Sequence, residues 1–384
     1  MPGQASDWFP FQEQQAKPPE EDCMNSRILL LCLLLGTAST ALAQEANSGF
    51  ELGATLSGEA LYSRQLASQP RNGDDVTGAF RAVLYPTWKV SQHWTFSGAV
   101  EAYSHPYFFE DFSNTTTGTS VQILHADVSY SRFWENSSIV LRAGQLSSAF
   151  GSFLLRYDDA VNPLIDTPMS YGYYLRGVST SSLAGVGLDA TVHKLDLRAQ
   201  LTNSSPANPR SVLDTDQYLN WTAGAGYTIR QGFRVGLSAY RGPYLDRQYP
   251  FYFPGEAEPK SLPATGIGVD AQWGHGHWNI NGEWQRFQMD YTVIPTFTES
   301  TGYGEVRLAL HPRWYIATRL GYVRPGAYAG WQWYEAAVGY RPGRHELVKV
   351  EYEVQQGSNI NGTQQNTLAV QFVTTLGPLS LAAH

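Results

Sequence analysis

Strict alternation of apolar and polar residues in short segments most constrains what this chain can fold into. In 348–355, every second residue is apolar and the residues between are charged or amides. Closely similar patterns occur in 195–201, 278–284 and 306–310. Successive side chains of a β-strand point to opposite faces, so each segment has one apolar face and one polar face. The pattern predicts strands, but a sandwich with its apolar faces turned inward would show it too.

An export signal precedes these segments. The one continuously apolar stretch, 28–35, is too short for a spanning helix, which needs about 20 residues. Arg27 precedes this stretch, and the small-x-small sequence Ala41-Leu42-Ala43 follows it, as in a secretory signal peptide with cleavage before Gln44. We therefore expect a signal peptide at 24–43, an extension ahead of the true start at 1–23, and a single domain at 44–384.

The charge and the cysteines of the mature chain exclude several classes of protein. Removing 1–43 leaves 24 of the 26 basic and 29 of the 34 acidic residues, a net charge of −5. Such a chain lacks the clustered basic surface that binds nucleic acid. Both cysteines, Cys23 and Cys32, lie before the expected cleavage point, so no disulfide, zinc–thiolate site or cysteine nucleophile is predicted. We also predict no cofactor.

Alternating segments and turn residues together predict sixteen strands. Their expected ranges are 50–63, 78–90, 93–104, 120–134, 137–146, 183–192, 194–204, 217–229, 232–242, 265–273, 277–290, 300–310, 313–323, 331–341, 346–356 and 366–376. The connections are alternately short and long. Tight turns on one side and long loops on the other are typical of outer-membrane barrels, and an even number of strands leaves both termini on the periplasmic side.

Tryptophan placement supports a membrane setting. Trp88, Trp94, Trp273, Trp278 and Trp314 fall beside tight turns and on the apolar faces of their strands. Indole rings favour the membrane–water interface, so a ring of tryptophans at one end of the strands indicates that the apolar faces meet lipid. The predicted fold class is all-β, a transmembrane antiparallel β-barrel of about sixteen strands.

A barrel of this size is too wide for wall side chains to fill and leaves a water-filled lumen. The acidic residues on the predicted inner faces outnumber the basic ones, which favours cations slightly. The longest loop, 147–182, is aromatic and acidic, and we expect it to fold into the channel with its aspartates opposite wall arginines such as Arg142 and Arg198. The alternative is that it forms an ordered lid outside the barrel. The predicted pore-lining and constriction residues are Arg142, Arg156, Asp158, Asp159, Asp166, Arg198, Glu305, Arg307, Arg319 and Glu351.

The chain resembles bacterial outer-membrane porins of the general and phosphate-selective types. The resemblance is carried by the signal peptide, the sixteen strands, and the segment from Arg142-Ala143-Gly144-Gln145 through Phe150-Gly151 to Asn162-Pro163. It implies a passive diffusion channel for small hydrophilic solutes or ions in the outer membrane, a third long loop folded into the pore, and a homotrimer. The chain departs from the family at its end, where His384 replaces the usual terminal aromatic residue.

Two other classes of function remain open. A barrel enzyme such as a lipase is one, but His125, Asp127 and Ser129 lie on a single strand and nothing orients them as a triad requires. A non-conducting surface or adhesion barrel is the other, because several long loops are polar and aromatic. His275 and His277 could contact a metal, but two ligands are too few, and we predict no metal site.

Overall fold

The computed structural model describes residues 49–64, 74–105, 107, 118–153, 157–171, 183–203, 219–244, 255, 257–258, 261–293, 295–326, 330–357 and 365–381. The expected extension, the signal peptide and Arg156 lie outside these residues. In the described part of the chain, no helix is long and apolar enough to cross a bilayer, a result that does not bear on strands.

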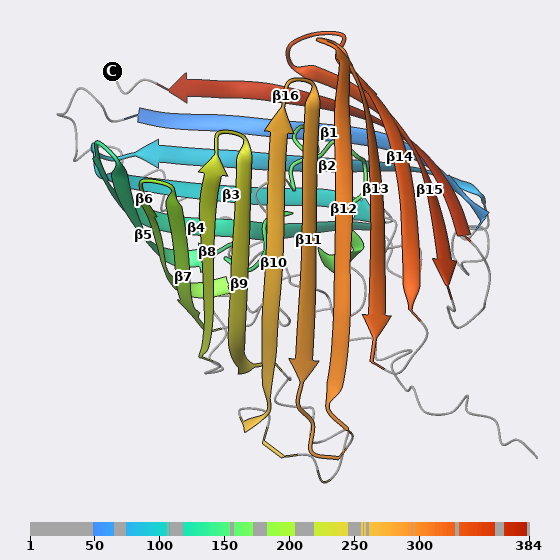
Figure 1. Cartoon of the computed structure of the whole chain (residues 1–384). Helices are drawn as coiled ribbons and strands as arrows, with labels where there is room; N and C mark the ends of the chain where they lie inside the picture. The colour runs from blue at the N-terminus through green and yellow to red at the C-terminus, as the bar shows by residue number, and fades with distance from the viewer. Residues whose placement is uncertain are drawn as a thin grey trace, which may run out of the picture. The chain divides into compact units, whose positions relative to one another are not determined.

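Sixteen strands form one closed antiparallel barrel, as predicted (Figure 1). They are β1 (Gly49–Ser63), β2 (Val76–Lys89), β3 (Trp94–His105), β4 (Gly118–Trp134), β5 (Ser137–Leu146), β6 (Leu183–Val192), β7 (Leu195–Thr202), β8 (Asn220–Arg230), β9 (Phe233–Pro243), β10 (Pro263–His275), β11 (Trp278–Met289), β12 (Phe297–His311), β13 (Trp314–Pro325), β14 (Trp331–Tyr340), β15 (Glu346–Gly357) and β16 (Gln365–Leu381). A short 3-10 helix, η4 (Met169–Tyr171), lies in the loop between β5 and β6. Every predicted strand is present within a few residues at its ends.

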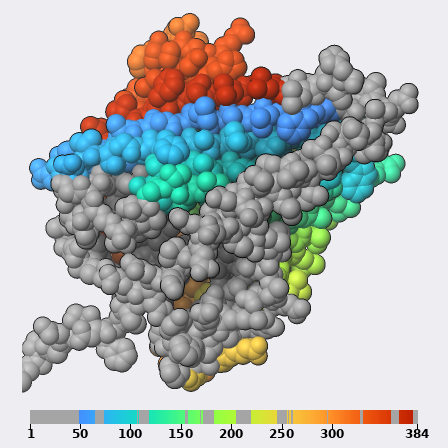
Figure 2. Space-filling view, turned by 180° about the vertical axis from the view of Figure 1, so that it is seen from behind, coloured from blue at the N-terminus to red at the C-terminus, as the bar shows by residue number. Residues whose placement is uncertain are grey.

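The barrel closes by pairing its first strand with its last. β1 pairs with β16 from Phe50 opposite Leu381 to Ser63 opposite Thr367, and the blue and red strands lie side by side in Figure 2. β16 continues five residues beyond the predicted end, past Gly377-Pro378. The register shifts at this dipeptide, where a bulge accommodates a proline that cannot donate a ladder hydrogen bond.

The apolar faces of the strands point outward. Large apolar side chains with exposed fractions above one third occur on all sixteen strands, whereas most charged side chains on the opposite faces are buried. Leu56 and Phe372 are examples of the outward set, and Glu59 and Gln371 occupy neighbouring inward positions on the same strands, β1 and β16. A soluble sandwich would show the reverse, so the structure has the inside-out distribution expected of a barrel in lipid.

Aromatic residues gather at the tight-turn end of the barrel, as the sequence predicts. Trp94, Trp278 and Trp314 are almost half exposed and follow the turns that begin β3, β11 and β13. Trp314 stacks on Tyr340 with ring centroids 4.4 Å apart. Such outward-facing rings at one level of the barrel form a girdle typical of a membrane interface.

Candidate functional site

The loop between β5 and β6 runs inside the barrel, along the inner wall. Ala149 donates a backbone hydrogen bond to Gln200 of β7 at 2.9 Å, and Gly151 donates one to Ser238 of β9 at 3.2 Å. Farther along the loop, Asp159 accepts a hydrogen bond from Ser57 of β1 at 2.6 Å. The described loop therefore contacts strands on most of the circumference. The expected inward fold is confirmed for these residues.

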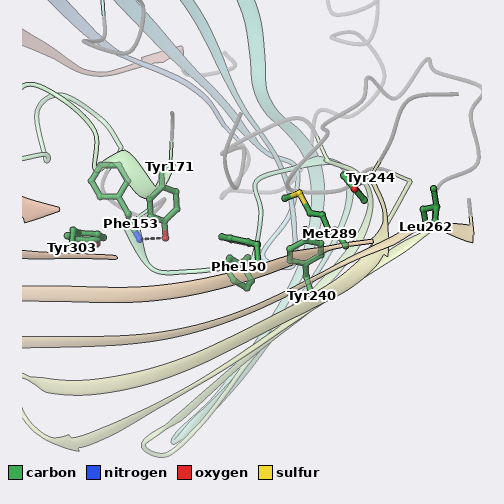
Figure 3. Close-up of a cluster of buried hydrophobic side chains, with 10 residues drawn as sticks. Phe150, Phe153, Tyr171, Tyr240, Tyr244, Leu262, Met289 and Tyr303 are labelled. Atoms are coloured by element: carbon green, nitrogen blue, oxygen red, sulfur yellow. Dashed lines mark hydrogen bonds between the residues drawn. The ribbon is translucent and has the colours of Figure 1, made fainter. Parts of the chain in front are cut away.

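Aromatic packing holds the first part of this loop against the wall. Phe150 and Phe153 are fully buried, and Phe150 lies edge-on to Tyr240 at 5.7 Å between ring centroids. Phe153 packs in the same way against Tyr303 at 6.3 Å. Figure 3 shows these loop phenylalanines directed at aromatic side chains of the strands, with a dashed hydrogen bond joining Phe153 to Tyr171. Packing of these buried rings against the strands fixes the position of the first part of the loop on the wall.

Glu283 of β11 is the polar partner of the same segment. Its carboxylate accepts hydrogen bonds from the backbone and hydroxyl of Ser152 at 3.2 and 3.1 Å, and from the Tyr171 hydroxyl at 2.5 Å. Burial, followed by the charge of Glu283, raises the pKa of Tyr171 well above its ordinary value. Tyr171 therefore stays protonated and donates to the carboxylate.

Gly151 is required where the loop passes between these groups. Its φ of 77° lies in the left-handed region that favours glycine, and a Cβ there would collide with the Tyr171 hydroxyl and the Glu283 carboxylate. The structure thus explains why a glycine follows Phe150 in this dipeptide, which is one of the segments that carry the sequence resemblance.

Asp159 of the loop binds three donors through its side chain. Its carboxylate accepts hydrogen bonds from Ser57 at 2.6 Å, from the Arg81 guanidinium at 2.8 Å and from the Tyr107 hydroxyl at 2.8 Å. Burial by itself would raise the pKa of Asp159, but the charges of Arg81 and Lys349 and these hydrogen bonds outweigh burial and hold the pKa below its ordinary value. Asp159 is therefore a charged anchor of the loop on β1 and β2.

Asp158 makes a second attachment to the same strands and begins a turn. Its carboxylate accepts hydrogen bonds from Thr55 at 2.9 Å and from the Tyr85 hydroxyl. Its other oxygen accepts the backbone N–H of Ala160 at 2.8 Å, and its backbone carbonyl accepts that of Asn162 at 2.8 Å. This Asx-type turn reverses the loop and exposes several backbone carbonyls in one direction.

Arg319 of β13 uses all five of its N–H donors. Two N–H groups bind Glu305 at 3.2 and 2.9 Å, and a third binds Glu335 at 2.9 Å. The remaining two bind the loop, at the Asp166 backbone carbonyl at 3.0 Å and the Asn162 side-chain oxygen at 3.1 Å. A planar guanidinium can satisfy two wall carboxylates and a loop at once because its donors form a rigid fork.

Lys349 of β15 binds the turn through its three ammonium protons. The Nζ atom lies 2.9 Å from the backbone carbonyl of Asp159, 3.3 Å from that of Asn162 and 2.8 Å from that of Leu164. Its neighbour on the same face, Glu351, accepts the backbone N–H of Ile165. β15 thus supplies a donor, Lys349, to the carbonyl of Leu164 and an acceptor, Glu351, to the N–H of the next residue, Ile165.

The expected pairing of the loop aspartates with Arg142 and Arg198 is wrong. Arg142 pairs instead with Asp189 of the adjacent strand at 3.1 Å, and Arg198 lies opposite Asp189 in the strand register. The loop leaves the barrel wall next to these arginines, but it crosses to strands distant in the sequence, where Arg81, Arg319 and Lys349 bind it. Arg307 is partly buried with its guanidinium 4.5 Å from the Tyr315 ring centroid.

Inner-face charges divide into a buried set and a set that reaches water. The buried set contains ten acids and three bases: Glu59, Glu101, Asp127, Asp270, Glu283, Glu299, Glu305, Glu335, Glu351, Glu353, Arg81, Arg319 and Lys349. Among the described charges that the sequence predicts on inner faces, those not buried are four arginines and two aspartates: Arg142, Arg198, Arg234, Arg307, Asp189 and Asp196. The acidic excess expected from the sequence is therefore concentrated in the buried set.

Several important residues were not singled out by the sequence. Arg81, Lys349 and Glu283 read as ordinary inner-face charges, and Asn162 appeared only as part of a resemblance. No local pattern distinguishes an inner-face charge that meets water from one that meets a folded loop. The adjacent Asp158-Asp159 was the available signal, because two acids in an aromatic loop require partners when they are buried.

The residues of the catalytic alternative do not assemble into a triad. The Ser129 hydroxyl donates to the Thr95 backbone carbonyl at 3.2 Å, and Asp127 accepts a hydrogen bond from Ser97 at 3.2 Å. The histidines beside the tight turns are exposed: His93, His193, His275, His277, His311 and His345.

Comparisons with known proteins bear on the fold. No family model matches the sequence, and no curated protein matches it significantly. Solved structures do match: an anion-selective porin from Comamonas acidovorans has a TM-score of 0.61 at 10% identity, covering 86% of this chain and 100% of that one. The outer membrane channel DcaP of Acinetobacter baumannii has a TM-score of 0.58 at 12% identity, covering 87% of this chain and 99% of the other.

A trimer form of OmpT, an outer membrane protein of Vibrio cholerae, also has a TM-score of 0.58 at 12% identity, with 86% of this chain and 99% of that one covered. At such low identity the likeness shows the fold alone. Together with the sixteen-stranded closed barrel and the loop inside it, it leads to one conclusion: this chain has the fold of the bacterial outer-membrane porins.

Proposed function

We propose that this protein is an outer-membrane porin, a passive diffusion channel for small hydrophilic solutes or ions. The observation that carries the proposal is the inside-out distribution of side chains in a closed sixteen-stranded barrel. Apolar side chains cover the outside, and charged side chains of both signs line the inside. Charged groups inside a barrel of this width favour water in the lumen, and water there permits solutes to cross.

The position of the loop supports a narrowed channel. The described loop packs against the wall from β7 round to β2, whereas Arg142 and Asp189 on β5 and β6 keep 44% and 39% of their side-chain surface exposed. We place the route for solutes beside Arg142 and Asp189, and next to Arg198 of β7 and Arg234 of β9, which are not buried either. The residues predicted to line or narrow the pore then have two roles. Arg142 and Arg198 lie beside the route for solutes, and the loop aspartates hold the loop that forms the constriction in place.

The charges that reach water favour anions slightly. Four arginines and two aspartates of the inner faces are not buried. Charge rings at a constriction decide which ions pass, and buried charges that are already paired contribute less to that choice. This proposal replaces the slight cation preference suggested by the total count of inner-face acids.

Planar-bilayer recording of the purified protein tests the function. A porin gives stepwise ohmic currents, whereas a non-conducting surface barrel stays silent although it is folded. An enzyme of the lipase type would hydrolyse phospholipid in detergent micelles, which a porin does not. Folding is verified in the same sample by the shift in mobility that an unboiled barrel shows on a denaturing gel, so silence of a folded sample refutes the channel.

Assembly remains part of the proposal. The resemblance to porins implies a homotrimer, and one of the matched structures is described as a trimer form. Conductance steps that appear in groups of three, together with a mass of three chains in native mass spectrometry, would support a trimer. A monomeric mass with single steps would contradict it.

A further inference from the structure

Three carboxylates converge where the loop meets β14 and β15. Asp166 comes from the loop, Glu335 from β14 and Glu353 from β15. Glu335 and Glu353 lie directly opposite each other in the register of these strands. One carboxylate oxygen of each residue lies within 4.8 Å of those of the other two, and all three residues are buried. Like charges placed opposite each other on a sheet repel, so this arrangement needs a compensating group.

The compensating charge among the neighbours is insufficient. Glu353 lies opposite Glu335 and close to Asp166, and Glu351 lies two residues earlier on the same face of β15. All five donors of Arg319 are already used, and the acceptors are Glu305, Glu335 and the loop, with none directed at Glu353. Burying a carboxylate without a counter-charge is costly.

Unsatisfied oxygen atoms provide an independent indication of a missing ligand. Glu353 is 4% exposed, and its Oε2 atom has no hydrogen-bond partner among the residues that the structure describes. The Oε1 atom of Glu351, two residues earlier on the same face of β15, is likewise without one. Buried polar atoms almost always have a partner, so two orphaned carboxylate oxygens beside a third and fourth carboxylate indicate a ligand with positive charge.

We propose that Asp166, Glu335 and Glu353 bind a calcium ion, with the free oxygen of Glu351 and water completing the shell. Calcium binds six to eight oxygens at about 2.4 Å, so two oxygens on one ion lie at most about 4.8 Å apart. The three oxygens lie within 4.8 Å of one another, which one calcium ion can span. Magnesium demands near-ideal octahedral geometry at about 2.1 Å and usually keeps several waters, so a cluster of carboxylates from the loop and two strands suits calcium better.

The ion would fasten the loop to the wall. Asp166 belongs to the loop, and its backbone carbonyl already accepts a hydrogen bond from Arg319 at 3.0 Å. Bound calcium adds a second connection at the same residue, to two further strands. Calcium therefore stabilises the loop position in addition to neutralising the carboxylates, and it raises the temperature at which the barrel unfolds.

Calcium titration of the folded protein tests this site. The barrel is purified in detergent, stripped with a chelator that is then removed, and titrated with Ca²⁺ by calorimetry. We expect one Ca²⁺ for each chain and a higher unfolding temperature on denaturing gels. E353Q keeps the size of the side chain but removes a charged ligand, and we expect it to weaken binding at least tenfold.

The matched control is E299Q. Glu299 is also a buried inner-face glutamate with an orphaned oxygen, but it lies six residues before Glu305 on β12 and outside the cluster. E299Q should bind Ca²⁺ like the unchanged protein. Equal loss of binding in E299Q and E353Q would mean that a general loss of folding causes the effect, and would overturn the assignment to this cluster.

A second variant keeps the proposal testable if E353Q does not fold. D166N changes a loop residue rather than a strand residue, and it should also weaken binding at least tenfold while the barrel keeps its gel mobility shift. The proposal fails if the stripped, folded protein takes up no Ca²⁺, if D166N and E353Q bind it unchanged, or if Mg²⁺ binds as tightly as Ca²⁺. None of these measurements needs a conducting channel, so they stand apart from the test of the proposed function.

Discussion

The Nζ atom of Lys349 lies 2.8 Å from the backbone carbonyl oxygen of Leu164, inside the barrel. The same nitrogen reaches two more carbonyls of the loop, so a single wall side chain satisfies three backbone acceptors that would otherwise be buried without partners. This contact couples the strand β15 to the loop that narrows the lumen. Loop position and barrel stability should therefore change together when it is removed.

Replacement of Lys349 by methionine tests that coupling. K349M keeps the length of the side chain but leaves three carbonyls without a donor and several acids without a nearby cation. We expect a loss of stability on the order of 3–5 kcal/mol, the range for breaking a buried charge interaction. The measurement is the denaturant midpoint of unfolding in detergent. K89M changes an exposed lysine of β2 and should leave the midpoint unchanged; equal effects of both variants would contradict the assigned contact.

Acid should release the loop through Asp159. Its pKa lies below the ordinary value, so its stabilising contribution is complete above the pKa of an unfolded aspartate, about 3.9, and is lost as the pH falls through the lower folded value. We expect steady channel currents at neutral pH and increasing current noise as the pH falls below about 4. In D159N this part of the acid response should be absent, with noise already present at neutral pH. An unchanged acid response in D159N would show that other groups control the loop.

Gly151 should not tolerate a side chain. In G151A, a residue with φ of 77° acquires a Cβ that collides with the Tyr171 hydroxyl and the Glu283 carboxylate, so the loop or the contacts that hold it must shift. We expect a larger single-channel conductance and a loss of stability above the ~1 kcal/mol of backbone strain alone. G276A is the control, because Gly276 also has positive φ but nothing lies within 4 Å of its Cβ position. Conductance in G276A should match that of the unchanged protein, and a matching change in both variants would rule out the collision.

Selectivity should depend on the arginines that reach water. The double variant R142Q/R198Q removes two of the four positive charges of this set, and we expect the reversal potential in a salt gradient to move toward cation selectivity. R132Q is the control, since Arg132 lies over the Trp134 ring on the outside of the barrel, 5.3 Å from its centroid. A reversal potential that does not move in R142Q/R198Q would place the solute route elsewhere.

The sequence by itself determined the sixteen strands and the direction of their faces, and it suggested, without deciding, that the long loop folds inward. These features follow from local rules, since alternation fixes the two faces of a strand, turn residues fix its ends, and tryptophans mark the interface. β5 and β6 match their predicted ranges, 137–146 and 183–192. β16 is longer than predicted because a bulge at Gly377-Pro378 lets pairing continue past a proline, which no local rule required.

Tertiary structure alone decided which residues meet inside the barrel. Closure of the sheet brings β13–β16 beside β1 and β2, so Arg319, Lys349 and Arg81 surround a loop that begins next to Arg142. The convergence of Asp166, Glu335 and Glu353, where we propose a calcium site, has the same origin. Alternation of apolar and polar residues tells which face of a strand a charged residue occupies. The partner of that residue depends on the path of the loop inside the barrel. That path is set by burial and charge over the whole barrel, which no local pattern contains.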